Sequence, residues 1–477
     1  MEQAGTACAK RPTSASKRSD PKKPNVMRKH LFVIAALAGT AGIAALLISF
    51  RPITRPIITG ARHPECCQAP RPKAEGCVFK TVFEGEGLDS SFVLKAPEKV
   101  ISAERDALQW LVRAQANDGG FGAGSHARQD IMDPHAVSTD PATTAMVAMA
   151  IMRMGSTLDQ GPYSQQLTKA TDYLLTQVES APKGAINITQ LQGTQIQAKL
   201  GANIDVALTA QYLSNLVAKL NEQHPKRLRA MRALNTCVGM IQSGQNADGS
   251  MRGDGWAGVL QSSFAASALE SAKAQGADVD DESLKLARDY QKSNFDAGKG
   301  TVATERAAGV TLYAVSGSTR NSAAEARELN EIVVQAKKEG KIKKDAPVNV
   351  QTLEDAGVSR GEAERLNTAY QVYNAAKQQA QADNVISGFG NNGGEEFLSF
   401  LQTGESLVIA KDQGWKNWYQ QTTGRLVSIQ NNDGSWNGHH CITSPAFCTA
   451  TSLLILSINN DIEHLLAQGA VKYRGGK

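Results

Sequence analysis

Several features are scarce in this sequence of 477 residues. Aromatic residues make up only 5% of the chain, whereas charged residues make up 20%, an ordinary value for a globular protein. The sequence contains neither the Cys-Gly-Glu-Gln motif of complement-type thioester domains nor a glycine-rich phosphate-binding loop. It does contain 42 glycines. Few aromatics and many glycines predict alanine-rich helices that are joined by numerous turns.

Net positive charge is concentrated at the N-terminus. Residues 1–30 hold eight Lys and Arg against Glu2 and Asp20, which leaves 43 basic and 44 acidic residues in the rest of the chain. The rest of the chain is so close to neutral that it offers no basic surface to which a polyanion could bind. Nucleic acid is therefore excluded as a partner.

A long apolar run follows the basic tail of residues 1–30. Residues 31–50 carry no charge, and at about 1.5 Å per residue a helix of this length spans a hydrocarbon core of roughly 30 Å. Arg51-Pro52 follows directly, where a cleaved signal peptide, the alternative, would have a small-residue cleavage site. We expect a single-pass transmembrane anchor. Basic residues are denser before the span than after it, so the tail is expected in the cytoplasm and the large domain outside it.

The segment 51–99 connects the anchor to the domain. Its prolines predict an extended linker, and a short strand or hairpin is expected within residues 77–99. Six of the seven cysteines would lie beyond the span in an oxidising compartment, where up to three disulfides could form. Cys237 lies at an apolar helix position and is expected to be a buried thiol.

Three segments share one phrase, in which a helix ends in Gln and an Asp-Gly pair precedes a small and then a large apolar residue. They are residues 115–121 (QANDGGF), 245–251 (QNADGSM) and 430–436 (QNNDGSW). Asp-Gly after a helix predicts a tight turn in which glycine supplies a positive φ. The phrase therefore marks the end of a repeating helical unit.

Between these turns, amphipathic helices alternate with Ala- and Thr-rich ones. Outer helices are expected at 100–116, 163–180, 225–244, 280–293, part of 322–382, and 413–430. Inner helices are expected at 140–154, 203–219, 259–274, 302–316, 393–409 and 443–458. Six hairpins predict a closed ring over residues 100–460, the alternative being an open solenoid. Residues 318–384 predict a helical insertion with a solvated charged face, and residues 461–477 a C-terminal tail.

The Gln-x-x-Asp-Gly-Ser-Trp phrases resemble the repeat motif of squalene and hopene cyclases and of protein prenyltransferase β subunits. The resemblance covers about residues 100–460 and implies an all-α, α6/α6 toroid whose ligand cavity is lined by the N-terminal ends of the inner helices. With its anchor and the ending WNGHHCITSPAFCTATSLLILSI, the chain resembles uncharacterised bacterial prenyltransferase/squalene-oxidase repeat proteins. This implies a bacterial inner-membrane location with a periplasmic domain.

Class II terpene cyclases use an Asp-x-Asp-Asp motif as proton donor, and residues 278–281 have this sequence. Here it precedes an outer-type helix and is followed by Glu282-Ser283, so we interpret it as a helix cap. The cyclase-like position is Asp140, before Pro141, where a single carboxylate stands. Asp140 and His135 are the catalytic candidates, with an N-cap and an exposed loop histidine as the alternatives.

Prenyltransferases hold zinc through an Asp-x-Cys on the fifth inner helix and a His on the sixth. Here the fifth reads GGEEF at 393–397 without the cysteine, and Cys448 stands where the family has His, so the set is incomplete. The residues still capable of binding zinc are Glu395, Glu396, His439, His440, Cys441 and Cys448. A Cys441–Cys448 disulfide is the competing interpretation.

The remaining cavity candidates lie near the starts of inner helices. Together with those above, the set that could face a ligand is Asp140, Asp205, Trp256, Glu305, Arg306, Glu395 and Glu396. The sequence favours an anchored toroid that binds a ligand or a protein partner in its central cavity, without terpene-cyclase activity. The alternative is a cyclase- or prenyltransferase-like enzyme for an isoprenoid or other lipid, with zinc as the one cofactor considered. A polysaccharide-active enzyme is disfavoured because aromatics are sparse and no acid pair is evident.

Overall fold

The structure is a computed structural model that describes residues 92–253 and 255–470. The expected basic tail, anchor and linker up to residue 91 lie outside this part of the chain. No helix within the described residues is both long and apolar enough to cross a membrane. Residues 92–97, the described part of the expected strand or hairpin, are not in a strand.

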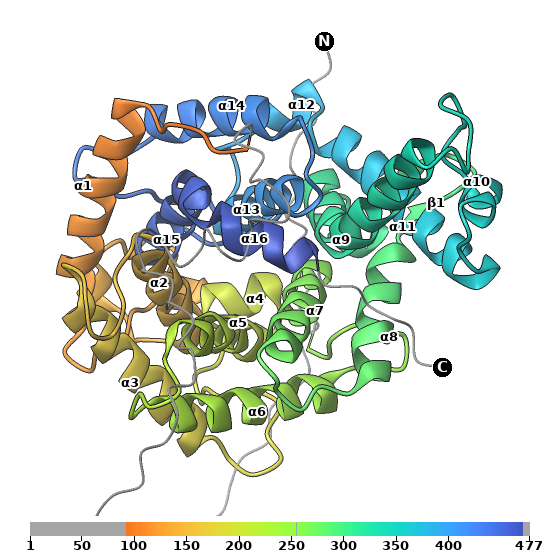
Figure 1. The fold of residues 1–477 in the computed structure, drawn as a ribbon. Coiled ribbons are helices and arrows are strands. Elements are labelled where there is room, and N and C mark those ends of the chain that lie inside the picture. Colours follow the sequence, from red (N-terminus) through yellow and green to blue (C-terminus); the bar gives the residue numbers. More distant parts are fainter. Residues whose placement is uncertain (1–91, 254, 471–477) are drawn as a thin grey trace, which may run out of the picture. The chain divides into compact units, whose positions relative to one another are not determined.

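Six inner helices form a closed ring (Figure 1). They are α2 (Pro141–Arg153), α5 (Ile204–Lys219), α7 (Gly258–Ala274), α9 (Thr311–Lys338), α13 (Gly394–Ile409) and α15 (Pro445–Leu456). Each contacts the next along the chain, and α15 contacts α2. This last contact closes the ring, so the α6/α6 toroid is confirmed and the open solenoid is wrong. Inner helices are buried on all sides, which is why they are rich in small apolar residues.

Six outer helices pack against the inner ones. They are α1 (Glu98–Ala114), α3 (Ser164–Ser180), α6 (Arg227–Gly244), α8 (Asp281–Lys292), α11 (Arg360–Ala380) and α14 (Trp415–Ser428). Each buries one apolar stripe and exposes the other face, as expected for amphipathic surface helices. Five inner and five outer helices begin and end within two residues of the ranges that the sequence predicts.

The three Asp-Gly phrases form equivalent turns. In each, the Gln side chain donates to the carbonyl of the turn glycine and to a carbonyl of the next outer helix. The second acceptors of Gln115, Gln245 and Gln430 are the carbonyls of Gln166, Ser283 and Ala103. Because Ala103 belongs to α1, the third turn joins the last outer helix to the first. The phrase thus fastens neighbouring hairpins to each other.

The glycine of each phrase is required for two reasons. Gly434 has φ +93°, which other residues adopt only with strain, and a Cβ there would lie 2.7 Å from the carbonyl oxygen of Asp106. The large apolar residue then folds back under the inner helix. The backbone N–H of Trp436, for example, donates to Oγ1 of Thr449 in α15 at 2.9 Å, and the indole is buried.

The fourth inner helix differs from the sequence prediction. It was expected at 302–316, but β1 (Phe295–Asp296) pairs antiparallel with β2 (Thr301–Val302), and η3 (Glu305–Ala307) follows, so α9 begins at Thr311. Residues 318–338 continue α9 without a break, because its second half has apolar positions to bury. A small cluster around Leu329, Val333 and Leu366 packs α9 against α11 and α10 (Val350–Asp355).

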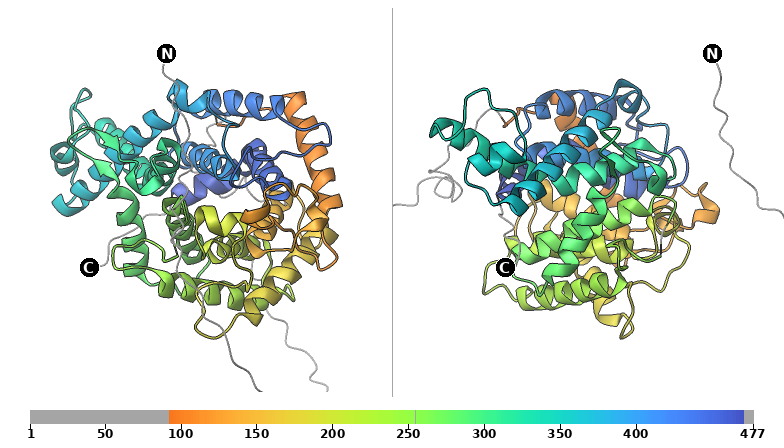
Figure 2. Two further views of the ribbon diagram at one scale, coloured as in Figure 1. Left: turned by 180° about the vertical axis from the view of Figure 1, so that it is seen from behind. Right: turned by 90° about the vertical axis from the view of Figure 1, so that its right-hand side faces the viewer.

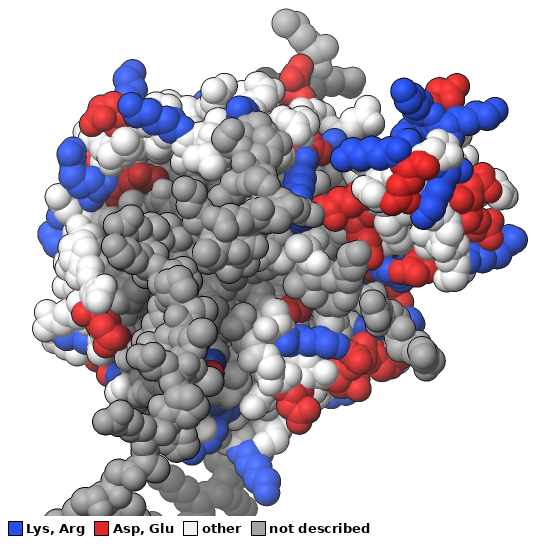
Figure 3. Space-filling view, viewed as in Figure 1, with Lys and Arg blue, Asp and Glu red and all other residues white. Residues whose placement is uncertain are grey.

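The expected insertion is therefore built from the extended end of α9, the fourth inner helix, together with α10 and the fifth outer helix α11, and α12 (Asp383–Ile386) leads into the fifth inner helix. Figure 2 shows this extension at one side of the ring. In Figure 3 both signs of charge are interspersed over it, as expected for a solvated face.

The C-terminal segment is not a tail as far as it is described, up to residue 470. Residues 457–469 form η4 (Ser457–Asp461) and α16 (Ile462–Gly469), which contact α9 and α13 at the C-terminal end of the inner helices. Arg327 donates to the carbonyl of Leu466 at 2.6 Å, and Arg320 donates to Oε1 of Gln468 at 3.1 Å. Buried Leu465 and Leu466 supply the apolar contact.

Candidate functional site

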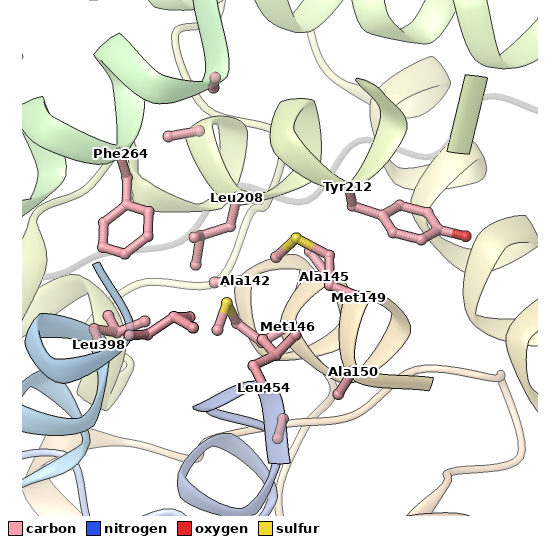
Figure 4. Packing of buried hydrophobic residues seen from close by; sticks show 14 of the residues in the cluster. Ala142, Ala145, Met146, Met149, Ala150, Leu208, Tyr212, Phe264, Leu398 and Leu454 are labelled. Atoms are coloured by element: carbon pink, nitrogen blue, oxygen red, sulfur yellow. The ribbon is translucent and has the colours of Figure 1, made fainter. Parts of the chain in front are cut away.

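Side chains fill the ring axis. Figure 4 shows Met146 of α2, Leu208 of α5, Phe264 of α7 and Leu398 of α13 converging between the inner helices, and all four are buried. A cavity of only about 40 Å³ lies between Met146, Phe264 and Leu401 and extends to Arg153, Asp461 and His464 at the C-terminal end of the inner helices. That volume suits water molecules, whereas small-molecule sites usually enclose about 300–1,000 Å³. This cavity is therefore too small for a ligand.

A short helix, α4 (Gln195–Leu200), spans the N-terminal end of the ring. At its start, Oε1 of Gln195 accepts hydrogen bonds from the backbone N–H groups of Thr443 and Ser444, just before α15. At its end, the carbonyl of Lys199 accepts from the N–H of Ala257, just before α7. The third and sixth inner helices lie on opposite sides of a six-membered ring. The helix α4 therefore bridges the end at which the sequence predicts the cavity.

Four functional groups converge on Lys199. Its ammonium lies 3.2 Å from Oε1 of Glu395 and 3.7 Å from Sγ of Cys441. It also lies 5.3 Å from the centre of the Tyr313 ring and 6.0 Å from that of Trp256. The Tyr313 hydroxyl donates to the same Glu395 oxygen at 3.2 Å. We call Lys199, Tyr313, Glu395 and Cys441 the lysine cluster; the sequence predicted Glu395 and Cys441 but missed Lys199 and Tyr313.

Glu395 and Glu396 are adjacent but have different surroundings. Glu395 is 0% exposed, and its Oε2 has no hydrogen-bond partner among the described residues. Glu396 turns back toward residues 390–392 and accepts from the N–H groups of Gly390 and Asn392. Burial raises the pKa of Glu396 to about 7. Glu396 thus holds its own loop and takes no part in the lysine cluster.

Asp140 is the N-cap of α2, as the sequence predicts. Its carboxylate accepts from the N–H and hydroxyl of Thr143 and from the N–H of Ala123. Burial raises the pKa of Asp140. His135 lies in η2 (Pro134–Ala136), exposed, and contacts the carbonyl of Arg113 at 2.9 Å. The interactions of Asp140 fasten a loop to α2, and those of His135 lie on the outer surface.

Asp205 has a similar role at the start of α5. It accepts from the N–H groups of Ile188 and Thr189, both at 3.0 Å, and is buried. Burial raises the pKa of Asp205 to about 7. Its hydrogen bonds face the loop before α4, so it fixes the segment that carries α4 over the ring.

The candidate zinc ligands are not assembled. Within residues 92–253 and 255–470, no group of three His, Cys, Asp or Glu is placed to hold a metal ion. His439 and His440 are exposed, whereas Cys448 is fully buried beside the carbonyl of Ile442. Cys441 and Cys448 of this described segment are not joined by a disulfide either. Cys448 faces inward from α15 while Cys441 faces Lys199, which separates their roles.

The remaining candidates lie elsewhere. Asp280 caps α8 by accepting from the N–H of Ser283, which confirms the capping interpretation of the Asp-x-Asp-Asp sequence. Glu305 and Arg306 are exposed in η3 (Glu305–Ala307), because α9 starts later than expected. The Arg306 guanidinium stacks 4.9 Å from the Tyr290 ring. Trp256 is 64% exposed beside the lysine cluster.

A ligand-sized hollow of about 810 Å³ lies at the opposite end of the ring, between α2, α5 and α16. Its apolar lining includes Met149, Met152, Leu454 and Ile462. Its polar lining includes Arg153, Asn215, Lys219, Asp461 and His464. We call this the α16 hollow. Sequence reasoning missed it because residues 461–477 were interpreted as a tail.

Arg153 and Asp461 of the α16 hollow form ion pairs. Arg153 ends α2 and pairs with Glu405 at 2.6 Å and Asp461 at 3.1 Å. Burial lowers the pKa of His464, so its imidazole is neutral at pH 7. A sequence signal did exist: Arg153 is the single charge of the otherwise apolar helix α2, and Glu405 is a charge in the mostly apolar second half of α13. Such charges are expected to be paired when they are buried.

Comparisons with known proteins give little further information. No protein-family model matches the sequence, and no curated protein matches it. Among solved structures, the chain is similar to the apo structure of the type II terpene cyclase MstE from Scytonema. The TM-score is 0.29 and the sequence identity 13%, over 76% of this chain and 98% of that chain.

Proposed function

We propose that this protein is a membrane-anchored toroid that binds a small amphiphilic ligand in the α16 hollow and has no terpene-cyclase activity. The observation that supports the proposal most directly is the difference in volume between two cavities of the ring. The cavity between Met146, Phe264 and Leu401 measures about 40 Å³, whereas the α16 hollow, with which it shares lining residues such as Arg153 and His464, measures about 810 Å³. The second volume lies within the usual range of small-molecule sites.

The lining of the α16 hollow supports the chemical class of the ligand. Met149, Met152 and Leu454 provide an apolar wall, and methionine adapts its shape to different ligands. Asn215 and the neutral imidazole of His464 provide hydrogen bonds. Lys219 is exposed at the rim and favours an anionic group on the head of the ligand, while half-buried Glu463 also lines the hollow. A molecule with an apolar body and an anionic head could contact the apolar wall, the hydrogen-bonding groups and Lys219 at the same time.

The absence of cyclase activity is proposed from Asp140. Protonating an alkene requires an acid that reaches the substrate. The single carboxylate at the cyclase-like position instead accepts three hydrogen bonds from its own loop and helix, and it is buried beneath them. An enzyme that processes an isoprenoid or other lipid is the alternative, and it would have to use groups of the α16 hollow.

Membrane attachment by residues 31–50 is part of the proposal and rests on the apolar run in the sequence. It would bring the domain to the outer face of a bacterial inner membrane, where amphiphiles are abundant. Fractionation of cells that express the full chain tests this: recovery in the membrane pellet after a carbonate wash is expected. Recovery in the supernatant would contradict the anchor without affecting the α16 hollow.

Native mass spectrometry of the full chain, released from detergent, tests the ligand. Ala218 is exposed and lines the α16 hollow, so Ala218→Trp should obstruct it. Ala467 is exposed on α16 and is not part of the lining, so Ala467→Trp is the matched control. We expect a bound amphiphile on the wild type and Ala467→Trp, and its loss from Ala218→Trp. Equal occupancy in all three chains would overturn the proposal, whereas release of a chemically altered amphiphile would favour the enzyme.

A further inference from the structure

The lysine cluster contains an accessible cysteine among cysteines that are not accessible. Cys441 is partly exposed, whereas Cys237 and Cys448 are 0% exposed. Burial in apolar surroundings raises the pKa of both buried thiols, which makes them poor nucleophiles. Of the three described cysteines, only Cys441 faces an ammonium group, with Sγ 3.7 Å from Nζ of Lys199.

Lys199 is fixed in position. Its side chain is only 9% exposed and is held by the carboxylate of Glu395 and by the Tyr313 ring. The backbone of α4 is fastened at both ends to the ring. A cation that cannot swing into solvent stabilises negative charge on a neighbouring sulfur and on an oxygen that forms beside it.

A second observation in the lysine cluster concerns a carboxylate oxygen that has no hydrogen-bond partner among the described residues. Glu395 is fully buried, yet its Oε2 has no partner among the described residues. A Cβ on Gly393 would lie 2.5 Å from this oxygen and 2.2 Å from the carbonyl oxygen of His440. The unpartnered oxygen therefore faces the backbone that leads into Cys441. Buried carboxylate oxygens normally have partners, so this oxygen can still accept a hydrogen bond from a polar group of a bound molecule.

We infer that the lysine cluster is a covalent site at which the Cys441 thiol accepts an acyl group from a thioester. The sulfur attacks the carbonyl carbon, and the new C–S bond forms as the carbonyl oxygen gains negative charge beside Lys199. The bond to the donor sulfur then breaks. The donor leaves as a thiol and takes the proton that Cys441 gave up, so no oxidant or reductant is needed.

Two features favour an acyl donor over a disulfide. An ammonium group stabilises the oxyanion of an attacked carbonyl, whereas thiol–disulfide exchange forms no oxyanion. The exposed indole of Trp256, with its ring centre 6.0 Å from Nζ of Lys199, offers an apolar surface for the acyl chain. This inference concerns the end of the ring opposite to the α16 hollow and does not depend on the proposed function.

The test uses the full chain in detergent and the octanoyl thioester of N-acetylcysteamine. Intact mass and peptide mapping should find one octanoyl group on Cys441 that hydroxylamine removes. Lys199→Met should slow acylation at least tenfold, whereas Lys199→Arg keeps the charge and should retain most of the rate. Cys448→Ser is the matched control, because its thiol is buried, and should acylate like the wild type.

Acylation of Cys441 no faster than that of glutathione under the same conditions would overturn the inference. So would an unchanged rate in Lys199→Met, or labelling of Cys237 or Cys448 in preference to Cys441. Should Lys199→Met fail to fold, Trp256→Ala replaces it, since Trp256 is exposed. A reduced rate of octanoyl transfer with an unchanged rate of acetyl transfer is then expected, and equal rates for both chains would contradict the site.

Discussion

Lys199 and Glu395 form a buried ion pair across the end of the ring, with Nζ and Oε1 3.2 Å apart. Lys199 comes from the short helix α4 and Glu395 from the first turn of α13. The pair therefore ties a connecting segment of the second hairpin to the fifth hairpin. Removing one partner from such a pair leaves an uncompensated charge in the interior, which is far more costly than removing both.

We therefore expect Lys199→Met and Glu395→Gln each to lower the free energy of unfolding. The loss should be about 3–5 kcal/mol for Lys199→Met, which leaves the buried carboxylate without its cation. The double variant should lose less than the sum of the two. Urea unfolding of the four chains, arranged as a double-mutant cycle, measures the coupling. Strict additivity would mean that the two side chains do not interact.

Gly434→Ala should destabilise the last turn. The substitution combines a φ of +93° with a Cβ 2.7 Å from the carbonyl of Asp106 in α1. A loss of roughly 1–3 kcal/mol is expected from such strain. Gly424 lies inside α14 with no atom within 4 Å of an added Cβ, so Gly424→Ala should be neutral or stabilising. Thermal denaturation compares the two, and equal midpoints would show that the turn tolerates a side chain.

Asp205 should make the fold less stable as the pH rises. Burial raises its pKa from 3.8 to about 7 in the folded chain. Below pH 3.8 the carboxyl is protonated in both states and carries no penalty. Between about pH 4 and 7 the unfolded state ionises first, so stability falls by up to roughly 1.4 kcal/mol per pH unit.

Asp205→Asn should remove the contribution of this residue to the slope, measured as a smaller difference in urea midpoint between pH 4.5 and pH 7, while buried Asp140 and Glu396 keep theirs. The matched control is Asp383→Asn, because Asp383 is exposed at the surface. The control should keep the pH dependence of the wild type. If Asp205→Asn keeps it as well, the carboxyl at position 205 ionises normally in the folded chain.

Phe264→Ala should open the ring axis. Phe264 packs between inner helices and is 7% exposed, so its truncation is expected to cost about 3–5 kcal/mol. Met146, Leu401 and Leu454 would form the apolar side of the void, and apolar voids bind xenon or benzene. We expect benzene to raise the melting temperature of Phe264→Ala and to leave Phe264→Leu and the wild type nearly unchanged. A benzene effect of the same size in the wild type would mean that the axis is already open.

Local rules account for most of the fold prediction. The Asp-Gly phrases mark the helix ends because glycine at Gly119, Gly249 and Gly434 adopts positive φ, and this depends on nothing distant. The caps at Asp140 and Asp280 follow from hydrogen bonds to the next turn of their own helices. The fourth hairpin was misjudged, because the start of α9 depends on where β1 meets β2 and on a cluster shared with α11.

The candidate site was predicted less completely. Glu395, Cys441 and Trp256 could be singled out by their chemistry, but Lys199 reads as one more charge on a short polar segment. Only the path of α4 across the ring brings Lys199 to Glu395 and Cys441. Likewise, no local pattern shows that Arg153, a charge at a helix end, pairs with Asp461. The two residues come from opposite ends of the domain.

The sequence by itself determined the helical hairpins, their number and the turns that join them, because periodicity, glycine conformation and capping act over a few residues. The tertiary structure alone decided where space remains inside the ring. Side chains pack around Phe264 on the axis of the ring. The helix α4 crosses one end of the ring, where Lys199 pairs with Glu395, and α16 packs against the other end. Those outcomes depend on contacts between distant segments, which short-range patterns do not encode.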